Sequence, residues 1–193
     1  MFNEYPWGRW IKWGIVALLI FVVIIGLISN YNSLVSANQD VESKWSQVEN
    51  VMQSRADKLN NLVEVVKGYT KHEEKVFGDI AAARSTLYNN TSDIKSKLDA
   101  DTAIANSLRG LLAIVENYPN LKASEQYTNL QVAIEGAENR VSVERKRFID
   151  STQTFNTKVT RFPGNIFARM MGFPPKNYFQ ASPDATKAPQ IKF

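Results

Sequence analysis

The sequence of 193 residues predicts an all-α protein, in which an N-terminal transmembrane helix leads into an elongated antiparallel four-helix bundle. Three observations predict this class. One uninterrupted apolar run lies near the N-terminus, apolar residues then recur every three or four positions, and no stretch alternates for long enough to be a strand. The predicted parts are an anchor at 1–30, an antiparallel helical bundle at 31–162, an amphipathic segment at 163–179 and a disordered tail at 180–193.

The anchor is predicted from the apolar run at residues 13–28, WGIVALLIFVVIIGLI, which contains no charged side chain. Together with residues 10–12 it provides nearly the roughly twenty helical residues, at about 1.5 Å each, that cross a hydrocarbon layer of about 30 Å. Aromatic and basic side chains suited to the membrane interface lie at its start. These predicted anchor residues are Trp7, Arg9, Trp10, Lys12 and Trp13.

A cleaved signal peptide is the alternative, because Val35-Ser36-Ala37 has the small residues of a cleavage site. The apolar run is longer than the usual signal core of about 7–15 residues, and Ala37 lies well beyond its end, so a retained anchor is favoured. Arg9 and Lys12 precede the run, whereas the first basic residue after it is Lys44. The positive-inside rule therefore predicts a single-pass protein of the cell membrane, with its N-terminus in the cytoplasm and its bundle outside, in the periplasm if there is an outer membrane.

The bundle is predicted from apolar seams with alternating steps of four and three, which favour left-handed packing of neighbouring helices. The seam of the first helix, about 31–67, is Leu34, Asn38, Val41, Trp45, Val48, Met52, Arg55, Leu59, Leu62 and Val66. The seam of the last, about 122–161, includes Tyr127, Leu130, Ile134, Ala137, Val141, Phe148, Phe155, Val159 and, just beyond it, Phe162. Between them we expect helices within 69–98 and 104–118, separated by Gly68, a turn at 99–101 and Pro119.

Short connections make neighbouring helices antiparallel, so the chain beyond Phe162 should return toward the bilayer. There, Gly172 is expected to end a short helix that begins after Pro163. The apolar candidates for an interfacial contact on this helix are Ile166, Phe167, Met170, Met171 and Phe173. Two interpretations stay open: the segment rests on lipid, or it covers the open end of the bundle or packs against a neighbouring subunit.

The net charge of +4 is concentrated at the two ends of the chain. Residues 161–193 carry five basic and one acidic side chain, whereas residues 29–160 carry 16 basic and 17 acidic ones. The basic ends favour anionic lipid headgroups as the counterpart. The basic run at 144–147 is flanked by acidic residues and predicts a solvated helix face, with no nucleic acid as partner.

The residues that carry catalysis in other proteins are few. The chain has no Cys and a single His, which excludes thiolate zinc sites, iron–sulfur clusters and cysteine nucleophiles. His72 lacks a glutamate three residues before it, where Tyr69 stands, so the spacing of a di-iron bundle fails. We therefore expect no enzyme activity, no metal, no cofactor and no small-molecule substrate.

Arg55 is a charged residue on the apolar seam of the first helix. If it is buried it needs a carboxylate partner, and the candidates for this buried polar network are Glu116, Glu135 and Glu138. Such a pair would fix the register of the helices. In the alternative interpretation, Arg55 extends its guanidinium to water.

Four blocks in order resemble the LemA family, and the resemblance covers about Tyr31 to Phe179. They are KWSQVENVMQSRADKLNNLVEVVKGYTKHEEKVF (44–77), LLAIVENYPNLKA (111–123), EGAENRVSVERKRF (135–148) and RFPGNIFARMMGFPPKNYF (161–179). Within ADKLNNLV, members of the family typically have a proline before NLV, and this chain does not. The resemblance implies a bacterial envelope protein with one N-terminal span and an antiparallel helical bundle. Related domains occur in magnetosome-membrane proteins, and members often lie near membrane-protease genes.

These observations predict a membrane-anchored, non-enzymatic scaffold or adaptor of the cell envelope that self-associates through its coiled-coil-like bundle. The expected partners are the lipid bilayer, further copies of the chain, and other envelope or membrane-protease-associated proteins. The alternative is a membrane-shaping or membrane-organising protein, which would use the Trp-rich anchor and the C-terminal apolar segment to hold lipid.

Overall fold

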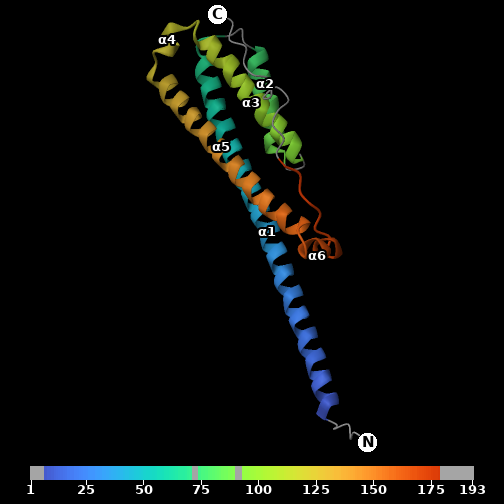
Figure 1. Cartoon of the computed structure of the whole chain (residues 1–193). Helices are drawn as coiled ribbons and strands as arrows, with labels where there is room; N and C mark the ends of the chain where they lie inside the picture. Colours follow the sequence, from blue (N-terminus) through green and yellow to red (C-terminus); the bar gives the residue numbers. More distant parts are fainter. Residues whose placement is uncertain (1–6, 71–73, 90–92, 179–193) are drawn as a thin grey trace, which may run out of the picture. The chain divides into compact units, whose positions relative to one another are not determined.

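The computed structural model describes residues 7–70, 74–89 and 93–178, and these form helices and connecting turns without a strand (Figure 1). The helices are α1 (Trp7–Lys67), α2 (Glu74–Tyr88), α3 (Ile94–Val115), α4 (Pro119–Lys122), α5 (Glu125–Thr160) and α6 (Gly164–Met170). The predicted all-α class is confirmed. The predicted tail at 180–193 and His72 lie outside the described residues.

The chain divides into two compact units. The central unit is Ser43–Phe148, and the terminal unit combines Met1–Glu42 with Ile149–Phe193. Helices α1 and α5 are long enough to contribute to both units. Different stretches of these two helices therefore contribute to the core of each unit.

In the central unit, ion pairs and ring contacts establish the directions of the helices. Arg55 meets Asp101 and Glu49 meets Lys97, so α1 and α3 run in the same direction. Arg55 also meets Glu138, and the ring centroids of Trp45 and Phe148 lie 5.4 Å apart, so α5 runs in the opposite direction. This arrangement agrees with the alternating directions predicted for short connections.

The core of the central unit combines members of the predicted apolar seams of α1 and α5 with apolar residues of α2, α3 and α4. Burying one such aliphatic side chain stabilises a fold by about 1.5–3 kcal/mol, which is why a repeating apolar stripe selects the inward face of each helix. The most deeply buried members are Val48, Met52, Leu59, Leu62 and Val66 of α1, Ile104, Leu111 and Val115 of α3, Leu121 of α4, and Ile134 and Val141 of α5.

The predicted break between the second and third helices is wrong. The turn expected at 99–101 lies inside α3, and the break falls before Ile94 instead. Asp93 is the N-cap of α3, since its carboxylate accepts a hydrogen bond of 2.7 Å from the Ser96 backbone N–H. Asp101 is 1% exposed and sits in mid-helix because it has buried arginine partners, which override the low helix propensity of aspartate.

In the terminal unit, α1 carries the apolar run as a continuation of the same helix. This part of α1 is long and apolar enough to cross a membrane, with a mean hydropathy of 2.8 over its most apolar stretch and no buried residue there. Trp10 and Trp13 are exposed, as is Lys12. Trp7 begins the helix and Arg9 follows within it, but their side chains lie outside the described part of the chain.

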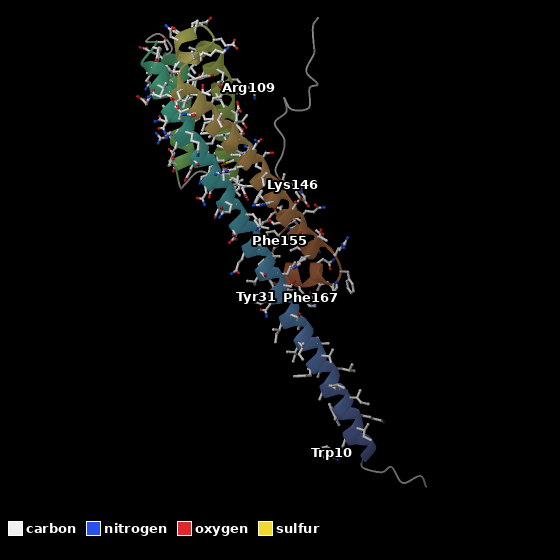
Figure 2. All side chains as sticks on the ribbon, turned by 90° about the vertical axis from the view of Figure 1, so that its left-hand side faces the viewer. Trp10, Tyr31, Arg109, Lys146, Phe155 and Phe167 are labelled. Atoms are coloured by element: carbon white, nitrogen blue, oxygen red, sulfur yellow. The ribbon has the colours of Figure 1, made fainter. Side chains whose placement is uncertain are left out.

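The rest of the terminal unit packs on the part of α1 that follows the apolar run. Leu34, Ala37 and Val41 are buried there together with residues of α5 and α6. The chain turns after α5, forms α6, and leaves it at Gly172, whose φ of 74° is the left-handed conformation that glycine adopts readily. Figure 2 shows the consequence: Phe167 lies at the level of Tyr31, and Trp10 lies at the far end of the apolar run.

Candidate functional site

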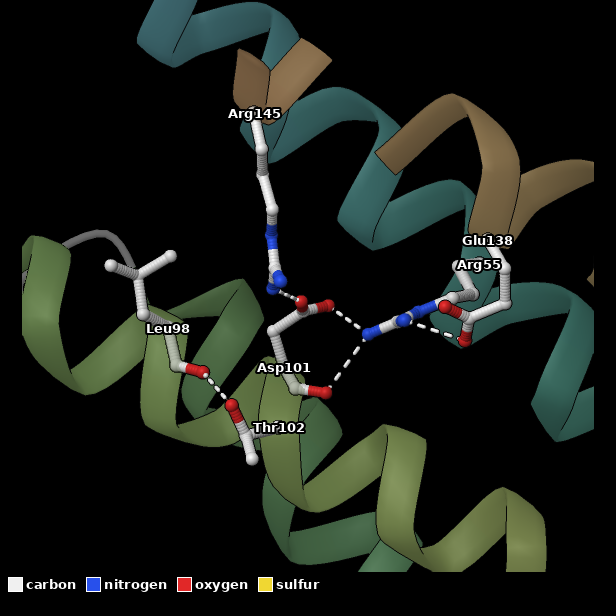
Figure 3. A network of polar contacts seen from close by, with 6 residues as sticks. All are labelled: Arg55, Leu98, Asp101, Thr102, Glu138 and Arg145. Carbon is white, nitrogen blue, oxygen red and sulfur yellow. Dashed lines mark hydrogen bonds and ion pairs between the residues drawn. The ribbon is translucent and has the colours of Figure 1, made fainter. Parts of the chain in front are cut away.

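The first candidate site is a buried ion network in the central unit (Figure 3). Arg55, on the seam of α1, is 2% exposed. Its Nη1 donates to Glu138 Oε1 at 2.6 Å, and its Nη2 donates to the main-chain carbonyl oxygen of Asp101 at 2.9 Å and also to the Asp101 carboxylate. The guanidinium of α1 is thereby bound to both α3 and α5.

Asp101 is the centre of the network. Its carboxylate accepts from Arg55 through Oδ1 and from Arg145 of α5 through Oδ2. Burial raises the pKa of Asp101, and the positive charges of Arg55 and Arg145 oppose that shift. Burial also lowers the pKa of Arg145, against the attraction of Asp101. Burial thus disfavours the charged form of both residues, and the attraction between their opposite charges offsets this desolvation cost.

The network is suited to fixing the register of the helices. Two arginines and two carboxylates balance in charge, and the most buried of them belong to α1 and α3. A second polar link joins the same two helices, where Lys97 donates to Glu49. Sliding α3 along α1 by one turn would separate both pairs and leave buried charges without partners.

The structure brings together part of the predicted polar network and corrects the rest. Arg55 and Glu138 are in contact, and the guanidinium is buried and does not extend to water. Glu116 and Glu135, the other two candidates for the partner of Arg55, are exposed and lie outside the network. Both belong to outward faces, and Glu135 accepts a hydrogen bond of 3.0 Å from Gln131.

Asp101 and Arg145 belong to the network but were not predicted from the sequence. Because 99–101 was predicted to be a turn, Asp101 was not expected inside a helix. The spacing of the neighbouring residues nevertheless indicates a helix there. The seam of α3 continues through Asp101 with alternating steps of three and four: Ile94, Lys97, Asp101, Ile104, Leu108, Leu111 and Val115. A charged residue at such a position, like Arg55 on α1, predicts a buried partner of opposite charge.

Other groups that could bind a ligand are few in the described ranges. No set of three or more His, Asp or Glu side chains there is placed to hold a metal ion. A shallow, open hollow is lined by Asn60, Ala81, Arg84, Ser85 and Tyr88. Two of these lining side chains already bind Asp57: Arg84 Nη2 donates to Asp57 Oδ1 at 2.9 Å, and the Tyr88 hydroxyl donates to the same oxygen at 2.5 Å. The hollow therefore presents an ion pair that is already formed.

The second candidate site is the surface of the segment around α6. Of the predicted interfacial residues, Ile166 and Met170 are exposed, whereas Phe167, Met171 and Phe173 are half-buried. Phe173 points inward, with its ring centroid 6.4 Å from those of Tyr31 and Phe155. Phe162, which was predicted to continue the α5 seam, is 80% exposed. The segment thus has one face that packs on α1 and α5 and one apolar face that is open.

Together, the apolar helix and the ion-paired bundle define the class of the protein: an α-helical bundle protein with one helix able to anchor it in a membrane. The sequence model of the LemA family matches residues 44–193, and the chain belongs to that family. It is a LemA-like membrane protein.

Three relatives place the chain more closely. It is 27% identical to magnetosome protein MamQ 2 of Paramagnetospirillum magneticum, over 88% of this chain and 71% of that protein. It is 25% identical to magnetosome protein MamQ of Magnetospirillum gryphiswaldense, over the same shares. It is 26% identical to protein LemA of Metamycoplasma hominis, over 86% of this chain and 78% of that protein.

Proposed function

We propose that the protein is a membrane-anchored, non-enzymatic scaffold or adaptor of the bacterial cell envelope that associates with further copies of itself. One observation carries the proposal: the buried ion network of the central unit pairs its charged groups with one another and thereby joins α1, α3 and α5. Asp101 is 1% exposed and is shared by two arginines, so no substrate reaches it. Catalytic acids and bases need access to a reacting group, which this cluster does not offer.

The outward face of α5 supports a second copy as a partner. Val132 and Val143 are 63% and 49% exposed, and with Gly136 and Asn139 they follow steps of four, three and four. This is the spacing of a seam between two parallel helices. Such pairing would also place Glu135 near Arg140 of the second copy, five positions further along, which is the charge pairing that flanks parallel coiled-coil seams.

The oligomeric state of the full chain in detergent tests this proposal. Light scattering coupled to size exclusion should give a particle that contains more than one copy. The double variant Val132→Glu and Val143→Glu should dissociate it, because four carboxylates would face one another across a two-copy seam. Ile94→Glu is the matched control, since Ile94 is also an exposed aliphatic residue of the central unit, on another helix. A monomeric wild-type protein would contradict the self-association.

A membrane-organising role is the second candidate, and the open apolar face of the α6 segment favours it. This face belongs to the same unit as the apolar run of α1. Two relatives are named as magnetosome proteins, which agrees with a role at a membrane.

Electron microscopy of reconstituted vesicles separates the two candidates. The triple variant Phe162→Ser, Ile166→Ser and Met170→Ser keeps Phe173 in place, which deletion of 163–179 would not. If the protein organises membranes, wild-type protein should change vesicle shape or clustering and the variant should not. If it is a scaffold, vesicles stay unchanged with both proteins while self-association persists in both.

A further inference from the structure

The position of the α6 segment relative to the apolar run is fixed within the terminal unit. Tyr31 follows Ile28, the last residue of the run, by three positions, or about 5 Å along a helix. The headgroup layer of a bilayer extends about 5–7 Å beyond the hydrocarbon on each side. Since Phe173 packs on Tyr31 and α6 lies beside this part of α1, the segment lies at headgroup depth when the run spans a bilayer (Figures 1 and 2).

Specific contacts hold the segment at that depth. The Asn156 side chain forms two hydrogen bonds with the backbone of Lys176, donating to its carbonyl oxygen at 2.7 Å and accepting from its N–H at 2.8 Å. Lys158 donates to the Ser33 hydroxyl at 2.9 Å and thereby links α5 to α1. The backbone N–H of Phe173 donates to Ala168 at 2.9 Å and closes the end of α6. The open face is therefore presented by a packed segment.

Large apolar side chains are concentrated on the open face. Phe162 is 80% exposed, Met170 77% and Ile166 49%, all within nine positions of the chain. Isolated exposed apolar residues are common on soluble surfaces, but a cluster beside a membrane-spanning helix is typical of interfacial segments. Contact with the acyl boundary would remove this area from water.

The charge of the segment selects the kind of lipid. From Arg161 to Tyr178 there are three basic residues and no acidic one. Lys176 is already engaged, since its Nζ lies 3.6 Å from Glu42 and 5.5 Å from the Phe155 ring centroid. Arg161 and Arg169 are exposed, and no acidic side chain pairs with either in the described part of the molecule. A guanidinium binds a phosphate oxygen pair through two parallel hydrogen bonds.

We propose that Arg161 and Arg169, together with the apolar residues Phe162, Ile166 and Met170, form a binding surface for anionic phospholipid in the leaflet from which α1 emerges. The apolar residues enter the acyl boundary, and the two guanidinium groups bind headgroup phosphates above it. The inference requires that α1 spans the bilayer but is independent of the scaffold role.

The absence of cysteine allows a clean test on the full chain. Met170→Cys labelled with a polarity-sensitive fluorophore reports the environment of this one position. In nanodiscs of phosphatidylcholine mixed with phosphatidylglycerol, the label should be in an apolar environment. Native mass spectrometry should find phosphatidylglycerol retained over phosphatidylcholine by on the order of tenfold, as expected for two basic groups at a membrane surface.

The double variant Arg161→Gln and Arg169→Gln should lose this lipid preference. Its matched control is Arg109→Gln with Arg147→Gln, two exposed arginines of the central unit, which should keep the preference. Circular dichroism should show equal helicity in all proteins.

Three results would overturn the inference: a label exposed to water, equal retention of both lipids by the wild-type protein, or a preference unchanged in the Arg161 and Arg169 variant. Loss of the preference on adding inorganic phosphate at constant ionic strength would indicate a free-phosphate site instead. The oligomeric state measured in detergent reports separately on the scaffold proposal, so the two can fail independently.

Discussion

Arg55 shows how a charged side chain can occupy a helix seam without opening the core. Its two terminal nitrogens are engaged by Glu138 and Asp101, so the cost of desolvating the guanidinium is offset by charged hydrogen bonds. Pairs of this kind contribute little net stability compared with apolar replacements, but they are costly to break from one side only. The residue is therefore expected to specify the register of α1 against α3.

Arg55→Met should lower the free energy of unfolding by about 3–5 kcal/mol, because Asp101 and Glu138 lose a buried partner. Urea titration of the detergent-solubilised chain, followed by circular dichroism, measures this change. Arg109→Met, at an exposed arginine of α3, should change stability by less than about 0.5 kcal/mol.

Adding Asp101→Leu to Arg55→Met should recover most of the loss, since no unpaired deep charge remains. Glu138 and Arg145 are 38% and 27% exposed and can turn toward water. If the two single losses simply added in the double variant, the coupling between Arg55 and Asp101 would be refuted.

Thr152 lies on the seam of α5, between Phe148 and Phe155, and is polar. Its side chain is fully buried, and its hydroxyl has no hydrogen-bond partner in the described structure. Thr152→Val should raise the free energy of unfolding by about 1 kcal/mol, because a buried hydroxyl without a partner carries a desolvation penalty.

Thr160→Val is the matched change, because the Thr160 hydroxyl donates to the Asn156 carbonyl oxygen at 2.7 Å. Differential scanning calorimetry should show a higher melting temperature for the Thr152 variant only. An equal rise in both would mean that β-branched apolar replacement, and not the missing partner, is responsible.

At the scale of elements, the N-terminus of α3 depends on one side chain. Hydrogen bonds from Ser96 lower the pKa of Asp93 below its ordinary value of 3.8. A carboxylate whose pKa is lower in the folded state than in the unfolded state stabilises the fold above the unfolded pKa. That contribution is lost as the pH falls through the folded pKa.

Asp93→Ala should therefore lower the melting temperature at pH 7, and its difference from the wild-type protein should shrink as the pH falls below about 4. Asp93→Asn should keep the cap, since an amide oxygen also accepts from the Ser96 N–H, and should lack the acid dependence. A difference for Asp93→Ala that is independent of pH would contradict the role of the carboxylate as the cap.

The α6 segment depends on the ring of Phe173 between Tyr31 and Phe155. Phe173→Ala should destabilise the docking of α6 by about 2 kcal/mol, as expected for truncating a half-buried aromatic ring. Hydrogen exchange at the α6 amides should accelerate by more than tenfold, while the amides of α3 keep their protection. Equal acceleration in both helices would indicate global unfolding and not local release.

At the scale of the whole molecule, the apolar run of α1 determines where the protein resides. We infer from Arg9 and Lys12 that the N-terminus lies in the cytoplasm and the central unit outside it. A reporter enzyme that functions only outside the cytoplasm should be active when it is fused after Phe193. A reporter that functions only in the cytoplasm should be inactive at the same position. Arg9→Glu with Lys12→Glu should weaken that preference, whereas Arg109→Glu, far from the run in sequence, should not.

The sequence by itself determined the helical class, the apolar anchor, and most of the buried residues of α1 and α5. These are consequences of local spacing, because apolar residues that repeat every three or four positions give a helix one apolar face, which packs away from water. The four sequence blocks, which occur in the same order as in the LemA family, supported the same fold. Boundaries were less predictable: Asp101 resembled a turn residue because its partners are 46 and 44 positions away in the chain.

Only the tertiary structure decided which polar residues meet and which apolar residues stay open. Arg55 pairs with Glu138 and Asp101 and not with Glu116 or Glu135. The rotation of α3 and α5 about their axes turns Asp101 and Glu138 toward Arg55. Phe173 was drawn inward by Tyr31 and Phe155, while Phe162 was left exposed. Periodicity tells which face of a helix is apolar, but the neighbour that covers it is set by packing between distant segments.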